Sequence, residues 1–419
     1  MMPHLISRFV RVAILGLMVA ACSHVAPVPP PAKTVSPPPA ASLPPAAPAP
    51  VPQVVQTPAV PAPAPAPLPA NRPATVALLL PLSGPSAPIG AALFNAAQMA
   101  LFEMADGSFN LLPFDSKGTA EGAVTATQQA LGQHADIIIG PIFSVEAKAA
   151  APLARQAGVA MVSFTTDSTA VGNGVFALGF LPGQQALRAA DYARSQNRPR
   201  LAVLAPSNDY GRRVADFLSN AAPQQGISIA ALEYYDAAAA DVGPAMKRLV
   251  KADPRRPAGD PGFDALLIPD EGQRLRVVAS GLAAQGIDPA RVKILGTMLW
   301  DEGHVGTEPA LVGAWYPSPP EATHTDFETR YARAFGGKPP RLASLGYDAT
   351  ALAAVLARRS PRDFSVGALT NPTGFAGVDG IFRLRQDGTA ERGYAIREVQ
   401  ANGPDKEIAP APASFQAIY

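Results

Sequence analysis

The sequence predicts an α/β protein of two doubly wound lobes, preceded by a disordered linker rich in proline and alanine. Three observations predict this fold class. Short apolar runs alternate with amphipathic segments of helical length, and the alternation occurs once up to residue 180 and again after it. Between residues 26 and 72 prolines recur every two or three positions and aromatic residues are absent. Such alternation is typical of parallel sheets covered by helices, whereas a segment with little to bury stays unfolded.

The first 21 residues are expected to be a lipoprotein signal peptide. Arg8 and Arg11 precede the apolar run VAILGLMVA, which is too short to span a bilayer well. The run leads into VAAC, in which Cys22 is the one cysteine of the chain, so an intramolecular disulfide is excluded. VAAC resembles the lipobox of bacterial lipoproteins, which implies lipid attachment at Cys22 and, with Ser23 next, sorting to the outer membrane. The alternative is an ordinary signal peptide with a cysteine nearby.

Residues 22–73 are expected to form a lipid-anchored, proline-rich linker. Residues 26–72 would reach on the order of 140 Å as an extended polyproline II helix, at about 3.1 Å per residue. That reach is far more than is needed to clear a lipid headgroup. The linker is either a passive spacer or a means of reaching a distant partner across the periplasm, and its length and stiffness favour the second interpretation.

The first lobe is predicted to begin with VALLLPL (76–82), an apolar run of the kind buried in a parallel sheet. A helix follows, with apolar residues at helical spacing from Ile89 to Met104 and a stop at Gly107. The pattern then predicts strands at 110–115, 136–140 and 159–164, and helices at 120–133 and 144–158.

The second lobe is predicted from a repeat of the same pattern. Its strands are expected at 200–206, 227–235, 263–269 and 292–297, and its helices at 209–226, 242–252 and 271–286. Two further helices are expected at 323–336 and 343–359. Residues 377–399 are expected to form a hairpin that turns at Asp387-Gly388.

The sequence favours a protein that is not an enzyme and needs no metal or cofactor. It contains no nucleophile elbow, zinc-protease motif or phosphate loop, and its net charge of +1 argues against nucleic-acid binding. The glycines of residues 172–174 partly match a dinucleotide fingerprint, but a strand follows them, so a turn is predicted. Asp301, Glu302, His304 and Glu308 crowd one loop, yet their spacing fits no helical ligand face.

Hydroxyl and acidic residues gather where the predicted strands end. In open α/β sheets ligands bind where the carboxyl ends of strands meet helix N-termini, because free N–H groups point there. The first-lobe strand ends carry Ser83, Ser144 and Thr165-Thr166, and those of the second lobe carry Tyr210 and Asp301. Each alone is typical of a capping turn. Their repetition on both lobes predicts a cleft between the lobes.

Three motifs in this order resemble the type 1 periplasmic-binding-protein fold of the leucine/isoleucine/valine-binding family: SGPSAPIG (83–90), IIGP (138–141) and NDYG (208–211). The resemblance runs from about residue 75 to residue 399. It implies a three-crossing hinge, with crossings near Phe180, Trp315–Pro317 and Asn371. It implies a first lobe of residues 74–180 and 317–370, a second lobe of residues 181–316 and 371–403, and a C-terminal tail of residues 404–419.

Together with the lipid anchor, the chain is similar to the outer-membrane lipoprotein activators of class A penicillin-binding proteins, whose C-terminal domain has this fold. Known members carry a helical-repeat domain where this chain has its linker. The resemblance implies a non-catalytic protein that docks on a peptidoglycan synthase and stimulates glycan polymerisation or crosslinking. The alternative is a lipid-anchored receptor for an amino acid or similar solute. A cell-wall hydrolase is not supported by any nucleophile–base pair or paired carboxylates.

The amino-acid receptors of this fold bind a ligand carboxylate with first-lobe hydroxyls and amides, pair its ammonium with an acidic residue and cover it with an aromatic ring. The residues that match these positions here are Ser144, Thr165 and Thr166 on the carboxylate side, Tyr210 as the aromatic wall and Asp301 as the ammonium partner. Ser83 is a further candidate ligand-binding residue because of its place at a strand end. Phe143 and Val145 flank Ser144 where receptors have small polar residues. This departure predicts either a different ligand or a cleft that binds none.

Overall fold

The computed structural model describes residues 72–104, 106–239, 241–250, 257, 259–301, 305–401 and 403–415. The predicted signal peptide, Cys22 and residues 22–71 of the predicted linker lie outside these residues. All the described residues fall in one compact unit. Within these ranges, no helix has both the length and the apolar composition needed to cross a membrane.

The first lobe is built on a five-stranded parallel sheet, in the order β2-β1-β3-β4-β5. Its strands are β1 (Ala74–Leu80), β2 (Phe109–Asp115), β3 (Ile137–Ile139), β4 (Ala160–Ser163) and β5 (Val175–Ala177). The central strands are fully buried apolar runs, as expected for a parallel sheet covered on both faces. Every strand predicted for this lobe is therefore confirmed.

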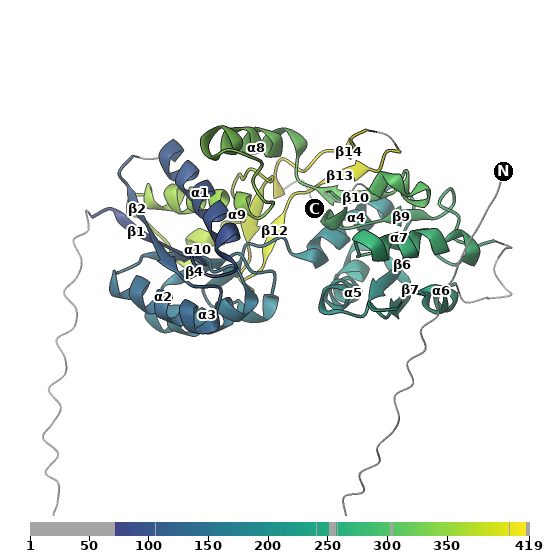
Figure 1. The fold of residues 1–419 in the computed structure, drawn as a ribbon, viewed down its shortest axis with the longest axis horizontal. Helices are drawn as coiled ribbons and strands as arrows, with labels where there is room; N and C mark the ends of the chain where they lie inside the picture. Colours follow the sequence, from purple (N-terminus) through teal and green to yellow (C-terminus); the bar gives the residue numbers. More distant parts are fainter. Residues whose placement is uncertain are drawn as a thin grey trace, which may run out of the picture. The chain divides into compact units, whose positions relative to one another are not determined.

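Helices cover both faces of this sheet. Successive side chains of β1 point to opposite faces, so the strand contributes apolar side chains to the core on each side. Val76 and Leu78 join the apolar cluster of α1 (Ala87–Met104) and α9 (Ala343–Ala357). Ala77 and Leu79 join that of α2 (Ala120–Gly132) and α3 (Ser144–Ala157) (Figure 1). Gly346 of α9 lies against the backbone of α1, where a β-carbon would come within 2.4 Å of a carbonyl oxygen. The outer helix α8 (Glu321–Phe335) and the short α10 (Val366–Leu369) complete this set.

The second lobe contains a seven-stranded sheet in the order β14-β13-β10-β9-β8-β6-β7. The strands from β6 to β10 all run parallel to one another. At one edge of the sheet, β13 pairs antiparallel with β10, and β14 pairs antiparallel with β13. The strands are β6 (Arg200–Pro206), β7 (Ser228–Tyr235), β8 (Ala265–Leu267), β9 (Lys293–Leu295), β10 (Trp315–Ser318), β13 (Ala395–Glu398) and β14 (Lys406–Ala409). The predicted parallel α/β class is thus confirmed for both lobes.

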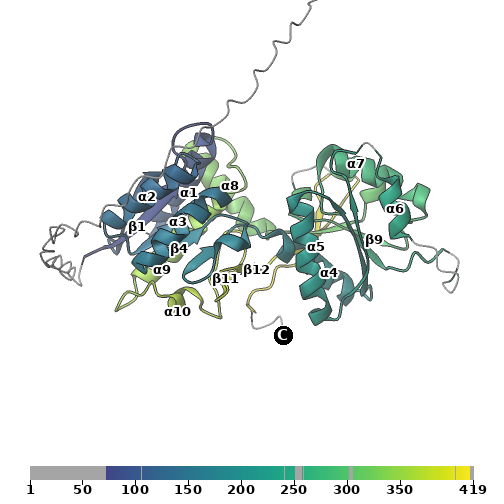
Figure 2. The same cartoon turned by 90° about the horizontal axis from the view of Figure 1, so that it is seen from below.

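The second sheet is also covered on both faces. α4 (Pro182–Ser195) and α5 (Asp209–Ala221) pack on one face, and α6 (Gly243–Leu249) and α7 (Gly272–Gly281) pack on the other (Figure 2). The sequence prediction did not include α4. Its inner face carries alanines that recur at helical spacing, such as Ala186 and Ala190, so the signal for this helix was present in the sequence.

The third passage between the lobes differs from the sequence-based boundary at residue 371. β11 (Phe382–Leu384) and β12 (Ala390–Arg392) form an antiparallel hairpin, and Phe382, Leu384 and Ala390 lie in the core of the first lobe. The backbone N–H of Ala177 also donates to the carbonyl of Gly388 at the hairpin turn. The chain therefore crosses near Gly393, because the hairpin buries its apolar side chains in the first lobe.

The C-terminal segment, expected to be a tail, belongs to the fold. β14 pairs with β13, and Phe415 is 1% exposed, with the Arg383 guanidinium 4.5 Å from the centre of its ring. Arg383 lies on β11, which packs on the first lobe. Residues 410–415, the C-terminal strap, therefore return from the second sheet to the first lobe.

Candidate functional site

The six site residues predicted from the sequence lie at the strand ends of both lobes. Ser83 follows β1, Ser144 begins α3, and Thr165 and Thr166 follow β4. In the second lobe Tyr210 lies in the first turn of α5, and Asp301 follows β9. The structure shows that most of these side chains are bonded to other groups of the protein.

Ser144 belongs to a charged cluster in the first lobe. Its hydroxyl donates to a carboxylate oxygen of Asp167 at 2.6 Å, and the ammonium of Lys148 lies 2.8 Å from the same carboxylate. Burial alone would raise the pKa of Asp167, but the bonds from Lys148, Ser144 and Thr169 hold that pKa well below its usual range. Asp167 therefore stays ionised and fixes the Ser144 hydroxyl.

The other first-lobe candidates differ in exposure. Ser83 is exposed, and its hydroxyl donates to Asp115 at 2.5 Å. Thr165 is buried, and its hydroxyl accepts from the backbone N–H of Asp167 at 3.1 Å, so it shapes the loop. Thr166 is exposed and lines a cavity of about 270 Å³ that also contains Phe217 of α5. Thr166 therefore shares this cavity with residues of the second lobe.

Tyr210 contacts the second-lobe loop that carries Asp301. Its hydroxyl donates to that of Thr297 at 2.9 Å, and burial raises the pKa of the phenol well above its usual value. The loop continues through Trp300, which is buried and donates from its indole N–H to the carbonyl of Asp270 at 2.9 Å. Tyr210 thus supports this loop as a neutral phenol.

Asp301 is surrounded by groups that bind its carboxylate. Arg341 lies 3.0 Å away, Arg397 lies 3.8 Å away, and the hydroxyl of Ser318 donates at 3.0 Å. The Asp301 side chain is 11% exposed and that of Arg341 is 15% exposed, so solvent screens this ion pair only weakly. The Asp301 carboxylate, which the sequence predicted to bind a ligand ammonium, is therefore already paired with arginines of the protein itself.

A second buried charged cluster lies beside Arg341. His324 Nδ1 lies 2.7 Å from Asp379, and His324 Nε2 lies 3.1 Å from both Glu328 and Arg341. Asp379 also accepts from the hydroxyl of Ser344. The carboxyl group of Asp379 is completely buried, but its partners His324 and Arg341 hold its pKa below the usual range.

The interlobe passage contains a third buried pair, Asp348 with Arg392, at 3.3 Å. Both side chains are almost inaccessible, and the Arg392 guanidinium lies over the Phe180 ring at 5.0 Å. Burial and the neighbouring Asp379 raise the pKa of Asp348 to about 7 in spite of Arg392. Sequence reasoning missed these residues. The available signal was charged residues inside otherwise apolar segments, as at Asp348 in the middle of α9.

The two alternative sites weighed from the sequence have ordinary structures. Residues 172–174 form a turn in which both glycines and Asn173 have positive φ, as predicted. Of the loop acids, Glu308 pairs with Arg276 at 3.4 Å, while Glu302 and His304 lie outside the described residues. Among the residues that the structure describes, no group of three His, Cys, Asp or Glu side chains could hold a metal ion.

Comparison with known proteins assigns the fold. Residues 73–404 match the family described as periplasmic binding protein. The C-domain of LpoA from Haemophilus influenzae, a regulator of PBP1A, is similar with a TM-score of 0.64 and 17% identity, over 80% of this chain and 100% of that one. No curated protein sequence matches the chain.

Transporter proteins are similar to a comparable degree. An ABC transporter substrate-binding protein from Sphaerobacter thermophilus has a TM-score of 0.61 and 20% identity, over 81% of this chain and 97% of that one. LivJ from Streptococcus pneumoniae, solved with isoleucine, has a TM-score of 0.54 and 19% identity, over 81% of this chain and 100% of that one. At such identities the likeness shows the fold and leaves open the function.

Proposed function

Because the chain belongs to the periplasmic binding protein family, we propose that it is a non-catalytic outer-membrane lipoprotein that binds and activates a peptidoglycan synthase. In this proposal Cys22 carries the lipid, the proline-rich linker crosses the periplasm, and the two lobes dock on a class A penicillin-binding protein. The family normally binds ligands or partners and does not catalyse reactions, which supports a role without chemistry of its own.

The internal pairing of Asp301 is the observation that carries the proposal. An amino-acid ligand would have to displace Arg341, Arg397 or both from this carboxylate in order to place its ammonium there. Removing one partner of a largely buried ion pair leaves the other charge desolvated, which costs several kcal/mol. The Ser144 hydroxyl is likewise bonded, to Asp167. These groups therefore favour a structural role over amino-acid capture.

The structural neighbour that regulates PBP1A supplies a precedent for this use of the fold. A second candidate function is a lipid-anchored receptor for an amino acid or a similar solute. It is supported by the likeness to LivJ, solved with isoleucine, and by the cavity at Thr166 and Phe217. The two candidates differ in what must bind: another protein, or a small solute.

One experiment separates them. The purified full chain is added to a purified class A synthase, and glycan polymerisation and peptide crosslinking are measured. Stimulation of either rate, with no calorimetric heat from free amino acids, is the expected result. An unchanged synthase together with saturable amino-acid binding would favour the receptor and refute the proposal.

The length of the linker provides a second test in cells. Deleting about half of residues 26–72 is expected to abolish function, because the lobes then fall short of an inner-membrane enzyme. The purified shortened protein should still stimulate the synthase in solution. Full function in cells with the shortened linker would show that the length of the linker is not required, which would contradict this part of the proposal.

A further inference from the structure

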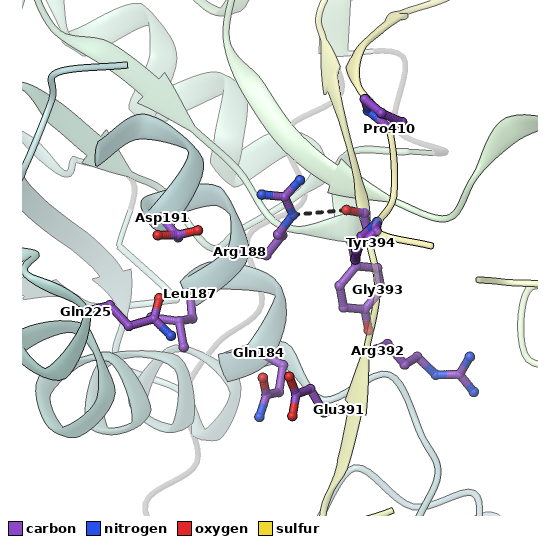
Figure 3. A pocket seen from close by; sticks show the side chains of 11 residues that line it. Gln184, Leu187, Arg188, Asp191, Gln225, Glu391, Arg392, Gly393, Tyr394 and Pro410 are labelled. Atoms are coloured by element: carbon purple, nitrogen blue, oxygen red, sulfur yellow. Dashed lines mark hydrogen bonds between the residues drawn. The ribbon is translucent and has the colours of Figure 1, made fainter. Parts of the chain in front are cut away.

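A pocket of about 340 Å³ lies where the chain makes its third passage between the lobes. We call it the hinge pocket, and it is distinct from the strand ends discussed above. α4 forms one wall with Leu187 and Arg188, and the passing strand forms another with Glu391 and Tyr394 (Figure 3). Pro410 and Pro412 of the C-terminal strap close it. Its volume falls within the range of small-molecule sites.

Both lobes contribute to this pocket. Leu187 and Arg188 belong to α4 of the second lobe, whereas Glu391 and Arg392 end the hairpin that packs on the first lobe. Gly393 connects the hairpin to the second lobe. The ring of Pro412 packs against Gly393, where a β-carbon would come within 3.0 Å of the proline ring. A molecule bound here would therefore contact the elements that move relative to each other when a hinge bends.

The charged groups around the pocket are paired with one exception. Asp191 is bound by Arg194 at 2.8 Å, Glu391 by Arg385 at 3.2 Å, and Arg392 by Asp348 at 3.3 Å. Within the described parts of the chain, Arg188 has no carboxylate within 4.0 Å, and its Nε donates to the carbonyl of Tyr394 at 3.0 Å. Figure 3 shows its guanidinium beside that carbonyl, between Gln184 and Glu391 at one end of the pocket and Pro410 at the other.

Arg188 is held in place and is partly desolvated. The bond to Tyr394 uses one edge of the guanidinium and leaves the terminal nitrogens for another acceptor. Burial lowers the pKa of Arg188, which reflects the cost of removing its charge from water. An arginine remains charged in proteins, so an anion that pairs with it would offset that cost.

We propose that the hinge pocket binds a small organic carboxylate. The carboxylate pairs with the terminal nitrogens of Arg188, the geometry in which a guanidinium binds two oxygens at once. The apolar part of the ligand lies against Leu187, Pro410 and Pro412. Gln184 and Gln225 supply amides for a polar substituent. The proposal applies equally to a synthase regulator and to a solute receptor, because it does not use the strand-end residues.

Binding at this place would couple to the hinge. A ligand that contacts α4, the passing strand and the strap is sensitive to their separation, so its affinity differs between lobe arrangements. Occupancy would shift the distribution of interlobe distances toward the arrangement in which all three walls touch the ligand.

The test uses isobutyrate as the probe and isobutyramide as its uncharged match in shape. Calorimetry on the purified full chain is expected to show saturable binding of isobutyrate at millimolar concentration, and at least tenfold weaker binding of the amide. Arg188→Gln should weaken isobutyrate binding at least tenfold. Arg333→Gln removes the same charge from an exposed position on α8 and should leave the affinity unchanged.

A second variant keeps the test decisive if Arg188→Gln disturbs folding. Gln225 is exposed at the rim, so Gln225→Trp should obstruct the pocket without altering the core and should also abolish binding. Equal binding of acid and amide, or no saturable binding of either, overturns the proposal. Loss of binding in Ser144→Ala with retention in Arg188→Gln places the ligand at the strand ends and also overturns it.

Discussion

Arg341, in the connection between α8 and α9, forms an ion pair with Asp301 in the loop after β9, with Nη1 3.0 Å from Oδ2. The connection packs on the first lobe and the loop belongs to the second, so this pair joins the two lobes. Arg341 also contacts His324, and Asp301 also contacts Ser318. The interlobe contact therefore links two side-chain networks that the chain brings together from distant positions.

Asp301→Asn is expected to lower the free energy of unfolding by about 3 kcal/mol, because it leaves the largely buried Arg341 without its carboxylate, while Arg397 keeps only its pair with Glu321. Urea unfolding at neutral pH measures the change. Spin labels placed on the two lobes should show a broader distance distribution. Asp326→Asn is the matched control, since Asp326 is 66% exposed in its pair with Arg330 and should cost less than about 1 kcal/mol. Equal losses in both variants would contradict the assigned role of Asp301.

Glu146→Gln is expected to stabilise the protein at neutral pH. Glu146 is fully buried in α3, and burial raises its pKa, although the Phe143 N–H donates to its carboxylate at 2.9 Å. A raised pKa means that the folded state favours the protonated form, so stability is greatest at low pH and falls as the pH rises through that pKa. The gain from Gln should therefore grow with pH in thermal melts.

The control for this substitution is Glu121→Gln, an exposed glutamate in the first turn of the neighbouring helix α2. It should change the melting temperature little at any pH between mild acid and neutrality. A loss of stability in Glu146→Gln that grows as the pH rises would show that the ionised carboxylate is required and would contradict the prediction.

Asp167→Asn should have the opposite pH dependence. The pKa of Asp167 is lowered, so its contribution is present above the ordinary carboxyl value and is lost as the pH falls through the lowered pKa. At neutral pH the variant should lose about 2 kcal/mol, the usual effect of removing hydrogen bonds to a charged group. Asp209→Asn, at an 88% exposed position, is the control. Denaturant titrations measure the free energies of unfolding of the unchanged protein and of Asp167→Asn. If these two values do not converge as the pH falls, the prediction is contradicted.

Phe415→Ala is expected to release the C-terminal strap without unfolding the lobes. Removing a fully buried phenylalanine costs about 3–5 kcal/mol when the site cannot collapse. Here the cost should appear as local opening, measured as faster hydrogen exchange in β14 and the strap. Phe102→Ala, at a 75% exposed position, should change exchange little. Unchanged protection in β14 would show that Phe415 does not anchor the segment.

Sequence patterns predicted most of the strands and helices because each of these buries a run or stripe of apolar side chains, whether large or small. β1 and β3 are such runs, and α1 carries its stripe from Ile89 onward. α4 was not predicted, although the alanines of its inner face recur at helical spacing, as those of α3 do. β14 escaped because four residues, KEIA, are too few to show a period, and their pairing with β13 depends on the rest of the sheet.

The strand pattern predicted that Ser144 and Asp301 lie at strand ends, and the structure has them there. It did not predict which side chains they bind. The partners of Asp301 lie on α8–α9 and β13, and no local pattern relates these segments to the loop after β9. The same holds for Asp348 with Arg392 and for His324 with Asp379. Such contacts arise from how the lobes are assembled.

The C-terminal strap sets a geometric limit on the molecule. Residues 410–415 can span about 20 Å at most when fully extended. While Phe415 stays buried beside Arg383, the end of β14 cannot move farther than that from the first lobe. The largest angle through which the two lobes can open is then set by the length of the C-terminal strap, and neither salt nor pH changes that length. Inserting flexible residues after Ala409 would widen that angle while every side-chain contact remained available.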